Sequence, residues 1–259
     1  MERLGLIAGN GQFPIVVART AKGKGYSVAA CAIRGETDPS LEKEVDALTW
    51  VEFWELEKLL DFFKSQGIHQ ALMAGQVRKE RLFKEPPRIP LPSRVADRAL
   101  LAVVVKSLKG IGVRLLDSTC FLSSDLAKKG CFSKRAPTSE ERKDIAFGRD
   151  VAKRTASFEI GQTVVVKQGV VLAIEALEGT DQAIRRGGGF GREGVVVVKM
   201  ARPRQDMRFD VPVIGPGTIE VLREVRASVL AVQAGKTLLI EKSRLLASAD
   251  EAGLSLVGI

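Results

Sequence analysis

Short apolar runs alternate with helical patterns along the first half of this chain. The apolar runs predict strands, and the segments between them repeat apolar residues at helical spacing. The predicted strands are residues 3–8, 27–33, 47–51, 71–74 and 113–117, and the predicted helices are residues 15–21, 54–65 and 94–108. Since strands separated by helices are typical of parallel sheets, we expect an α/β domain with helices on both faces of one sheet.

The first predicted strand ends in a glycine-containing loop, Gly9-Asn10-Gly11-Gln12-Phe13, which Pro14 follows. Backbone amides at such a strand–loop–helix junction can approach an anion, as in nucleotide-binding α/β folds. The third glycine of the dinucleotide fingerprint is absent, because Pro14 stands where close helix–strand packing would require it. The loop is therefore either a ligand contact or a plain tight turn. Gln76 is a second candidate contact, since it follows the fourth strand at the edge where open sheets bind ligands.

The second half has its own alternation of strands and helices, which predicts a separate α/β domain. Residues 128–144 are rich in charged and small polar residues, and Thr138-Ser139-Glu140-Glu141 forms a capping box that opens a helix over 139–157. We therefore expect an N-terminal domain over residues 1–132 and a C-terminal domain over 133–259. The further predicted strands are residues 163–166, 170–174, 195–200, 229–232, 238–240 and 254–257, and the further helices are residues 219–225 and 243–252.

A glycine-rich segment in the second half carries several candidate ligand groups. Thr180 is placed to cap a helix, Asp181 follows it, and Arg185-Arg186-Gly187-Gly188-Gly189-Phe190-Gly191-Arg192 comes next. The clustered glycines predict a mobile loop. With arginines such as Arg192 beside it, this loop could close over a diphosphate as a lid, or it could be an ordinary flexible connection.

The segment Ala201–Glu220, ARPRQDMRFDVPVIGPGTIE, has a dense pattern of polar groups. Polar residues alternate there with apolar ones, which predicts a half-buried strand with its charged groups on one face. These charged residues are Asp206, Arg208 and Asp210. Gly215-Pro216-Gly217-Thr218 then turns into a helix, whose N-terminal amides attract phosphate. Carboxylates beside a phosphate normally need a divalent cation, so the segment indicates metal-assisted phosphoryl chemistry; the alternative is an edge strand with a solvated face.

The composition indicates an acidic partner. The net charge is +9 and the pI is near 9.6, which fits nucleic acid, an anionic membrane surface or a phosphorylated small molecule. Aromatic residues make up only 5% of the chain, and this disfavours base stacking. A basic run over residues 78–88 could meet lipid head groups.

The cysteines and the apolar runs bear on location. Cys31, Cys120 and Cys131 have no metal-ligand spacing and leave one unpaired in any disulfide scheme, so we expect a reducing cytosol. No signal peptide is expected from the N-terminal residues. Nor does any apolar run approach the roughly 20 residues that span a bilayer.

Four segments together resemble one known family. They are GNGQFP, AGQVRKERLF, EGTDQAIRRGGGFG and ARPRQDMRFDVPVIGPGTIE. Over essentially its whole length the chain is similar to the UDP-2,3-diacylglucosamine pyrophosphatases of the LpxI type, from the lipid A pathway of Gram-negative bacteria. Phe13 departs from the pattern, since leucine is expected in the opening loop.

The resemblance implies a Mg²⁺-dependent hydrolase, with Mn²⁺ as a possible substitute. It would split UDP-2,3-diacylglucosamine into UMP and 2,3-diacylglucosamine 1-phosphate, called lipid X, with water attacking the phosphorus on the sugar side. A Rossmann-like N-terminal domain, a C-terminal α/β catalytic domain and a site between them are also implied. Asp210 matches the family's essential aspartate and is our catalytic residue and metal ligand, with Asp206 as a second catalytic candidate.

The substrate-binding candidates come from both halves of the chain. They are Gly9, Asn10, Gly11, Gln12, Phe13, Gln76, Thr180, Asp181, Arg192, Arg208, Gly217 and Thr218. We expect a cytoplasmic protein in peripheral contact with the inner membrane, without a nucleic-acid partner, and a homo-oligomer is left open. Two alternatives remain: a nucleotide- or lipid-binding module without catalysis, and a nicotinamide-dependent oxidoreductase.

Overall fold

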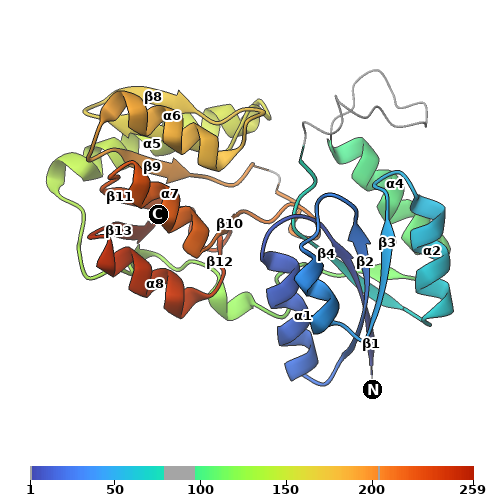
Figure 1. Ribbon diagram of the computed structural model, residues 1–259. Helices are drawn as coiled ribbons and strands as arrows, with labels where there is room; N and C mark the ends of the chain where they lie inside the picture. Colours follow the sequence, from blue (N-terminus) through green and yellow to red (C-terminus); the bar gives the residue numbers. More distant parts are fainter. Residues whose placement is uncertain (1, 79–96, 204) are drawn as a thin grey trace. The chain divides into compact units, whose positions relative to one another are not determined.

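The computed structural model describes residues 2–78, 97–203 and 205–259 (Figure 1). The chain forms two compact units, the first made of Met1–Ser123 with Asp206–Asp210 and the second of Ser124–Gln205 with Val211–Ile259. The sequence had suggested a single boundary after residue 132. It gave no sign that a short segment of the second half packs with the first unit.

The first unit is built on a five-stranded parallel sheet. Its strands are β1 (Arg3–Ala8), β2 (Ser27–Ile33), β3 (Ala47–Val51), β4 (Gln70–Ala74) and β5 (Arg114–Leu115), and its helices are α1 (Phe13–Gly23), η1 (Pro39–Glu44), α2 (Leu56–Ser65) and α4 (Asp97–Gly110). In the strand order β3-β2-β1-β4-β5, β2 and β3 lie on one side of β1, and the chain then crosses to the other side to form β4 and β5. The predicted parallel α/β organisation is confirmed, and this order is the one that doubly wound sheets use when they bind nucleotides at the reversal.

Both faces of this sheet are covered, which is why β1 and β2 are apolar almost throughout. Ile7 and Cys31 belong to a cluster with Phe63 of α2 and Leu108 of α4. The alternate residues of β1, such as Leu4, point to the opposite face, which α1 covers. Burial raises the pKa of the Cys31 thiol, so this cysteine is an inert core group.

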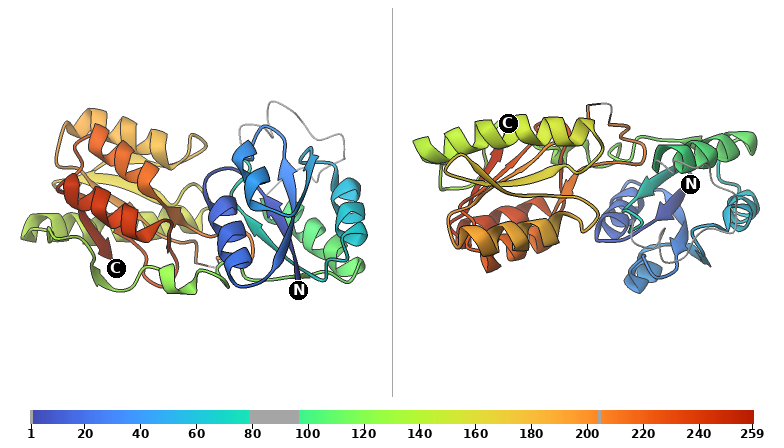
Figure 2. Two further views of the ribbon diagram at one scale, coloured as in Figure 1. Left: turned by 60° about the horizontal axis from the view of Figure 1, so that its bottom comes forward. Right: turned by 90° about the horizontal axis from the view of Figure 1, so that it is seen from above.

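The second unit is built on a six-stranded mixed sheet. Its strands are β6 (Gly130–Cys131), β7 (Thr163–Lys167), β8 (Val170–Ile174), β9 (Val196–Lys199), β11 (Val229–Val232) and β13 (Ser255–Gly258), in the order β6-β13-β11-β9-β7-β8. Its helices are η2 (Ser123–Asp125), α5 (Ser139–Ser157), α6 (Thr180–Gly191), α7 (Pro216–Glu224) and α8 (Lys242–Glu251). A separate parallel pair is formed by β10 (Val213–Ile214) and β12 (Leu238–Leu239). Figure 2 shows the yellow-green α5 on one face of the sheet and the orange to red α6, α7 and α8 on the other.

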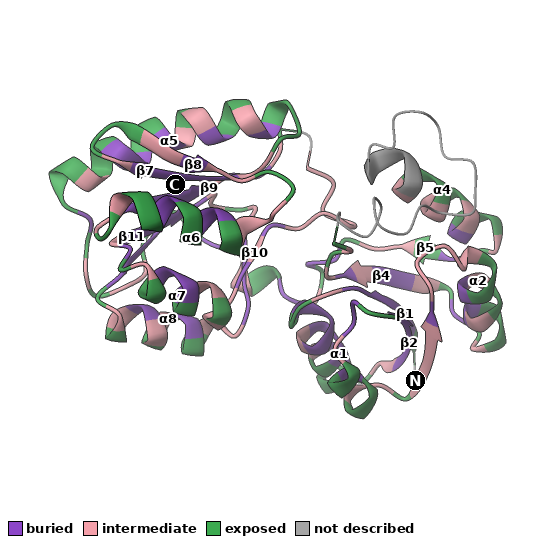
Figure 3. Cartoon of the chain, turned by 45° about the horizontal axis from the view of Figure 1, so that its top comes forward, coloured by how far each residue is buried: buried purple, intermediate pink, exposed green. Residues whose placement is uncertain are grey.

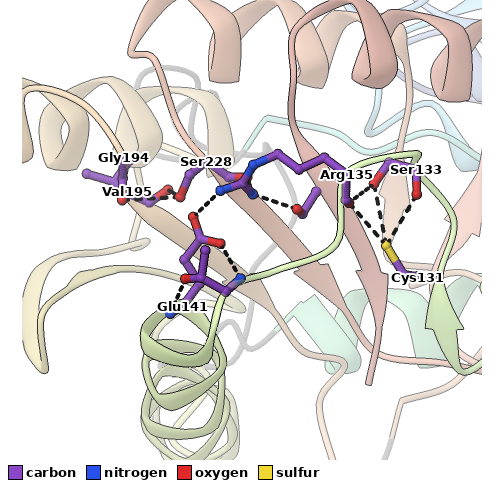
Figure 4. A network of polar contacts seen from close by, with 9 residues as sticks. Cys131, Ser133, Arg135, Glu141, Gly194, Val195 and Ser228 are labelled. Atoms are coloured by element: carbon purple, nitrogen blue, oxygen red, sulfur yellow. Dashed lines mark hydrogen bonds and ion pairs between the residues drawn. The ribbon is translucent and has the colours of Figure 1, made fainter.

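The start of α5 is fixed by the predicted capping box, which is confirmed. Thr138 Oγ1 accepts from the Glu141 amide at 3.2 Å, and Glu141 Oε2 accepts from the Thr138 amide at 2.8 Å. Arg135 extends this network to Glu141, to the Ser228 carbonyl and to Ser255 of β13 (Figure 4). Burial opposes ionisation of Glu141, but the bonds from Arg135 and Thr138 prevail and lower its pKa. The network ties the chain before α5 to the sheet.

The prediction of a mobile glycine loop over residues 185–192 is wrong, because α6 continues through the glycines to Gly191. A Cβ on Gly187 would lie 2.6 Å from Cβ of Val165, and one on Gly188 would lie 2.3 Å from Cβ of Val225. These positions are buried on one side of α6, whose outer side is exposed (Figure 3). The glycines therefore allow a close approach of α6 to β7 and to the end of α7, and the segment is a packed helix rather than a mobile loop.

Two features of the sequence bear on membranes: the length of its apolar helices and the basic run over residues 78–88. In the described part of the chain, no helix has both the length and the apolar character needed to cross a bilayer. The basic run over residues 78–88 lies outside the described residues from position 79 onward, as does the predicted start of α4 at residues 94–96.

Neighbouring glycines of α6 test this packing. Gly188→Ala should lower the free energy of unfolding by about 1–3 kcal/mol, because its new methyl group overlaps Val225. Gly189→Ala should raise it by about 0.5–1 kcal/mol, since no atom lies within 4 Å of its Cβ and alanine favours the helix. Urea denaturation of both variants measures the difference, and equal effects would contradict the close contact.

Candidate active site

The loops after β1 and β4 lie against each other at the carboxyl edge of the first sheet. The Asn10 amide donates to the Gln76 carbonyl at 2.8 Å. Gly75 has a φ of +82°, and a Cβ there would lie 2.4 Å from the Asn10 carbonyl oxygen, so only glycine fits. The structure thus brings together the predicted loop Gly9–Phe13 and Gln76, at the point where the strand order reverses.

Glu36 joins this arrangement and was missed by the sequence analysis. Its side chain is fully buried, and Oε2 accepts from Asn10 Nδ2 at 3.2 Å and from Arg78 Nε at 3.1 Å. Arg78 also donates to the Gly35 carbonyl at 2.7 Å. Glu36 therefore links the loops that follow β1, β2 and β4. Its place just after a predicted strand is the signal that could have identified it.

The remaining residues of the first loop have distinct roles. Gln12 is the N-cap of α1, and its Nε2 donates to Asp38 Oδ2 at 3.5 Å. Gly11 is exposed, with a φ of +88°. The Phe13 side chain is only 5% exposed and lies in the core, so only its backbone amide at the start of α1 remains for substrate.

The strand predicted through Asp206–Val213 is wrong: residues 207–209 form a turn, and β10 includes only Val213 and Ile214. Asp206 causes the turn, because its carbonyl accepts from the Asp210 amide at 3.0 Å and its Oδ1 accepts from the Arg208 amide at 3.1 Å. The Arg208 guanidinium pairs with the Asp206 carboxylate at 2.7 Å and keeps the pKa of Arg208 above its ordinary value. The charged groups predicted to share a strand face are instead gathered by a turn.

This turn packs on the first unit at Ser118. The Ser118 amide donates to the Met207 carbonyl at 2.9 Å, and Ser118 Oγ donates to the Arg208 carbonyl at 2.6 Å. Ser118 is fully buried and follows β5, so it lies at the same sheet edge as the loops after β1 and β4. Asp206, Arg208 and Asp210 therefore belong to the carboxyl edge of the N-terminal sheet.

In the second unit, polar groups gather at the start of α6. The N-cap is Gly179 rather than the predicted Thr180. Thr180 Oγ1 instead donates to Glu175 Oε1 at 3.0 Å and accepts from Lys199 Nζ at 2.9 Å. Loss of surrounding water raises the pKa of Asp181, against the opposing effect of Lys199. Lys199 was missed because the sequence shows it only as the end of a buried strand.

The structure does not bring Arg192 to this group. Arg192 is the C-cap of α6, and the rise of a helix of this length places it roughly 17–18 Å from Asp181 and Thr180 along the helix axis. Gly217 and Thr218 lie in the first turn of α7. Since α6 leads into β9 and α7 leads into the parallel neighbour β11, the two helices begin at the same side of the sheet.

The metal predicted from the sequence can be compared with the oxygen donors that the structure describes. Among the described residues, no group of three or more His, Cys, Asp or Glu side chains is arranged to hold a metal. Asp210 is the metal ligand predicted from the sequence, and the Asp206 carboxylate of the same turn pairs with Arg208. Mg²⁺ is usually bound by one or two carboxylates together with substrate phosphates. A single carboxylate at a sheet edge that also carries loop amides is compatible with binding of this kind.

The contact between the loops after β1 and β4 can be tested at Gly75. Gly75→Ala should lower the free energy of unfolding by about 2–4 kcal/mol, because it adds a backbone clash to positive-φ strain. Gly25→Ala is the matched control, since Gly25 has a φ of +87° but no atom within 4 Å of its Cβ. Its loss should be about 1 kcal/mol by denaturant unfolding. An equally small loss for Gly75→Ala would show that the two loops are not in contact.

Comparisons with known proteins agree along the whole chain. Residues 3–124 match the LpxI N-terminal domain, and residues 128–257 match the LpxI C-terminal domain. The UDP-2,3-diacylglucosamine pyrophosphatase LpxI of Caulobacter vibrioides is 31% identical over 278 residues, which cover 100% of this chain and 98% of the relative.

Two solved structures of synthetases show a distant similarity to this chain. The N5-carboxyaminoimidazole ribonucleotide synthetase of Thermotoga maritima is 16% identical, with a TM-score of 0.26 over 68% of this chain and 41% of its own. The ADP complex of the corresponding synthetase purK is 12% identical, with a TM-score of 0.31 over 72% of this chain and 44% of its own. This chain thus spans less than half of either enzyme, and these likenesses carry no argument. The two matching domain families and the full-length relative show that the chain belongs to the LpxI family.

Proposed function

We propose that this protein hydrolyses the diphosphate of UDP-2,3-diacylglucosamine in lipid A biosynthesis, releasing UMP and lipid X. The relative from Caulobacter vibrioides carries this substrate in its name, and the similarity extends over the full length of both chains. Family membership therefore supports the reaction class and the substrate together.

The observation that carries the proposal is the position of the Asp206–Asp210 turn. Two hydrogen bonds from Ser118 hold its backbone at the carboxyl edge of the N-terminal sheet. The glycine loop Gly9–Phe13 and Gln76 lie at the same edge, and the strand order there supports a Rossmann-like ligand site. A carboxylate and anion-binding amides at one edge are what phosphoanhydride hydrolysis requires.

The residues of the turn have separate tasks in this proposal. Asp210 acts at the reacting phosphate, where its carboxylate orients the attacking water or holds the metal. Arg208 is already bound to Asp206, so this ion pair shapes the turn and presents Asp210. The amides of the glycine loop bind phosphate oxygens and orient the diphosphate for attack on the sugar-side phosphorus.

Magnesium is part of the proposal. A Mg²⁺ ion, which Mn²⁺ could replace, would be held by Asp210 and would neutralise charge on the diphosphate. The oxygen donor set disfavours zinc, which prefers histidine and cysteine in its protein sites.

We also propose that the protein works at the cytoplasmic face of the inner membrane. Its substrate carries two acyl chains, and a protein of net charge +9 is attracted to anionic lipid. Peripheral contact without insertion is sufficient for access to such a lipid.

Asp210→Asn tests the proposed chemistry. Turnover of UDP-2,3-diacylglucosamine to UMP should fall about 100-fold or more, because the variant keeps the side-chain shape but loses the charge that acts on phosphate or water. Asp61→Asn is the control, since Asp61 is 77% exposed in the middle of α2 and is not among the candidate site residues. Turnover within about tenfold of wild type would remove Asp210 from the mechanism.

Metal removal is a separate test. Dialysis against EDTA should abolish turnover, and added Mg²⁺ or Mn²⁺ should restore it while Zn²⁺ should not. The measurement is UMP release at equal protein concentration before and after each addition. Full activity in the presence of EDTA would contradict the role of the metal.

A further inference from the structure

A cavity of about 580 Å³ opens beside the glycine loop of the first unit. Its walls come from the loop after β1, the loop after β2, the start of η1, and Trp50 of β3. Its volume is in the range of small-ligand sites, which is about 300–1,000 Å³. All of the lining residues belong to the first unit.

The polar wall of this cavity is held in a fixed geometry. Asp38 Oδ1 accepts from the Ser40 amide at 2.9 Å, and Oδ2 accepts a long bond of 3.5 Å from Gln12 Nε2. A carboxylate oxygen has two lone pairs, so Oδ2 keeps the capacity to accept from a ligand. The bonds from Ser40 lower the pKa of Asp38, which keeps it ionised at neutral pH.

The buried side chain of Glu36 holds two of the loops that form this wall together. It accepts from Asn10 and Arg78, and so fixes the loop after β2 against the loop after β1. Thr37 adds a second anchor, since its Oγ1 donates to the Ala8 carbonyl at 2.6 Å. The cavity is therefore largely preformed, which lowers the entropic cost of binding.

The position of the cavity indicates its ligand. In doubly wound sheets, phosphates bind at the loop after the first strand, and an acidic residue after the second strand accepts from ribose hydroxyls. Here the glycine loop follows β1 and Asp38 follows β2. Trp50 lies on the neighbouring β3 and is partly exposed, so its indole ring offers a surface on which a nucleotide base could pack.

We propose that this cavity binds the ribonucleoside of the substrate, with Asp38 accepting from the ribose hydroxyls and Trp50 lying along the base. The choice of uridine rests on the proposed function. The assignment adds Asp38 and Trp50 as specificity-determining residues, and it gives Gln12 and Asn10 a place between ribose and diphosphate.

Calorimetric titration of the full chain with UMP tests the role of Asp38. Asp38→Asn keeps an acceptor for the Ser40 amide but loses the charge, so the Kd for UMP should rise about tenfold or more. Wild type should prefer UMP to 2′-deoxy-UMP, and the variant should lose most of this preference. Glu42→Gln, on the exposed side of η1, is the control and should bind UMP as wild type does.

The fluorescence of the two tryptophans provides an independent readout. In a Trp54→Phe variant, UMP should change the emission of Trp50. In Trp50→Phe, where only Trp54 remains, UMP should leave the emission unchanged. The opposite pattern would overturn the placement of the base.

The outcomes separate this inference from the proposed function. UMP binding that is insensitive to Asp38→Asn, or AMP binding tighter than UMP, would overturn the pocket assignment even if the lipid substrate is hydrolysed. UMP binding that depends on Asp38, in a protein that does not hydrolyse the lipid substrate, would support the pocket and overturn the proposed function.

Discussion

The hydrogen bonds between Ser118 and the Asp206–Asp210 turn are the contact on which the candidate active site depends. They are made by a fully buried residue, so water does not compete for them. The loop that carries Ser118 is itself fixed, because Asp117 Oδ1 accepts from both the amide and the hydroxyl of Thr119. Without this contact, Asp210 would lie on a connection with no defined relation to the glycine loop.

Glycine has two different uses in this protein, and composition does not distinguish them. Gly75 provides a backbone conformation and a close approach that place Asn10 beside Gln76. The glycines of α6 instead remove side-chain volume, so that a helix can lie directly on Val165 and Val225. From the sequence alone, glycines at both places predict a flexible backbone. In the structure, the backbone at both places is in close contact with its neighbours.

Most of the fold could be predicted because its elements are fixed locally. The strands of the first sheet are continuous apolar runs, and the capping box at Thr138 sets the start of α5 by contacts within a single turn. The first loop and Gln76 could also be placed together, because strand ends in a parallel sheet share an edge.

The failures concern features that depend on partners distant in sequence. The Asp206–Asp210 segment alternates like a strand, but its turn and its position are set by Asp206 and by Ser118, which lies in the other half of the chain. The α6 glycines favour a loop in isolation, and only packing against β7 and α7 makes them helical. Glu36 gains its role from partners in the loops after β1 and β4, and Lys199 gains its role from Thr180 of α6.

The return of Asp206–Asp210 to the first unit also sets an order of assembly during synthesis. N-terminal domains generally fold first as the chain emerges from the ribosome. Here the sheet of the first unit can form once Ser123 has been made, but the Ser118 hydroxyl and amide meet their native partners only after residue 208 has appeared. A nascent chain therefore holds the carboxyl edge of the first sheet before Asp210, the proposed catalytic residue, has joined it. Catalytic competence comes late, when most of the second unit has been synthesised.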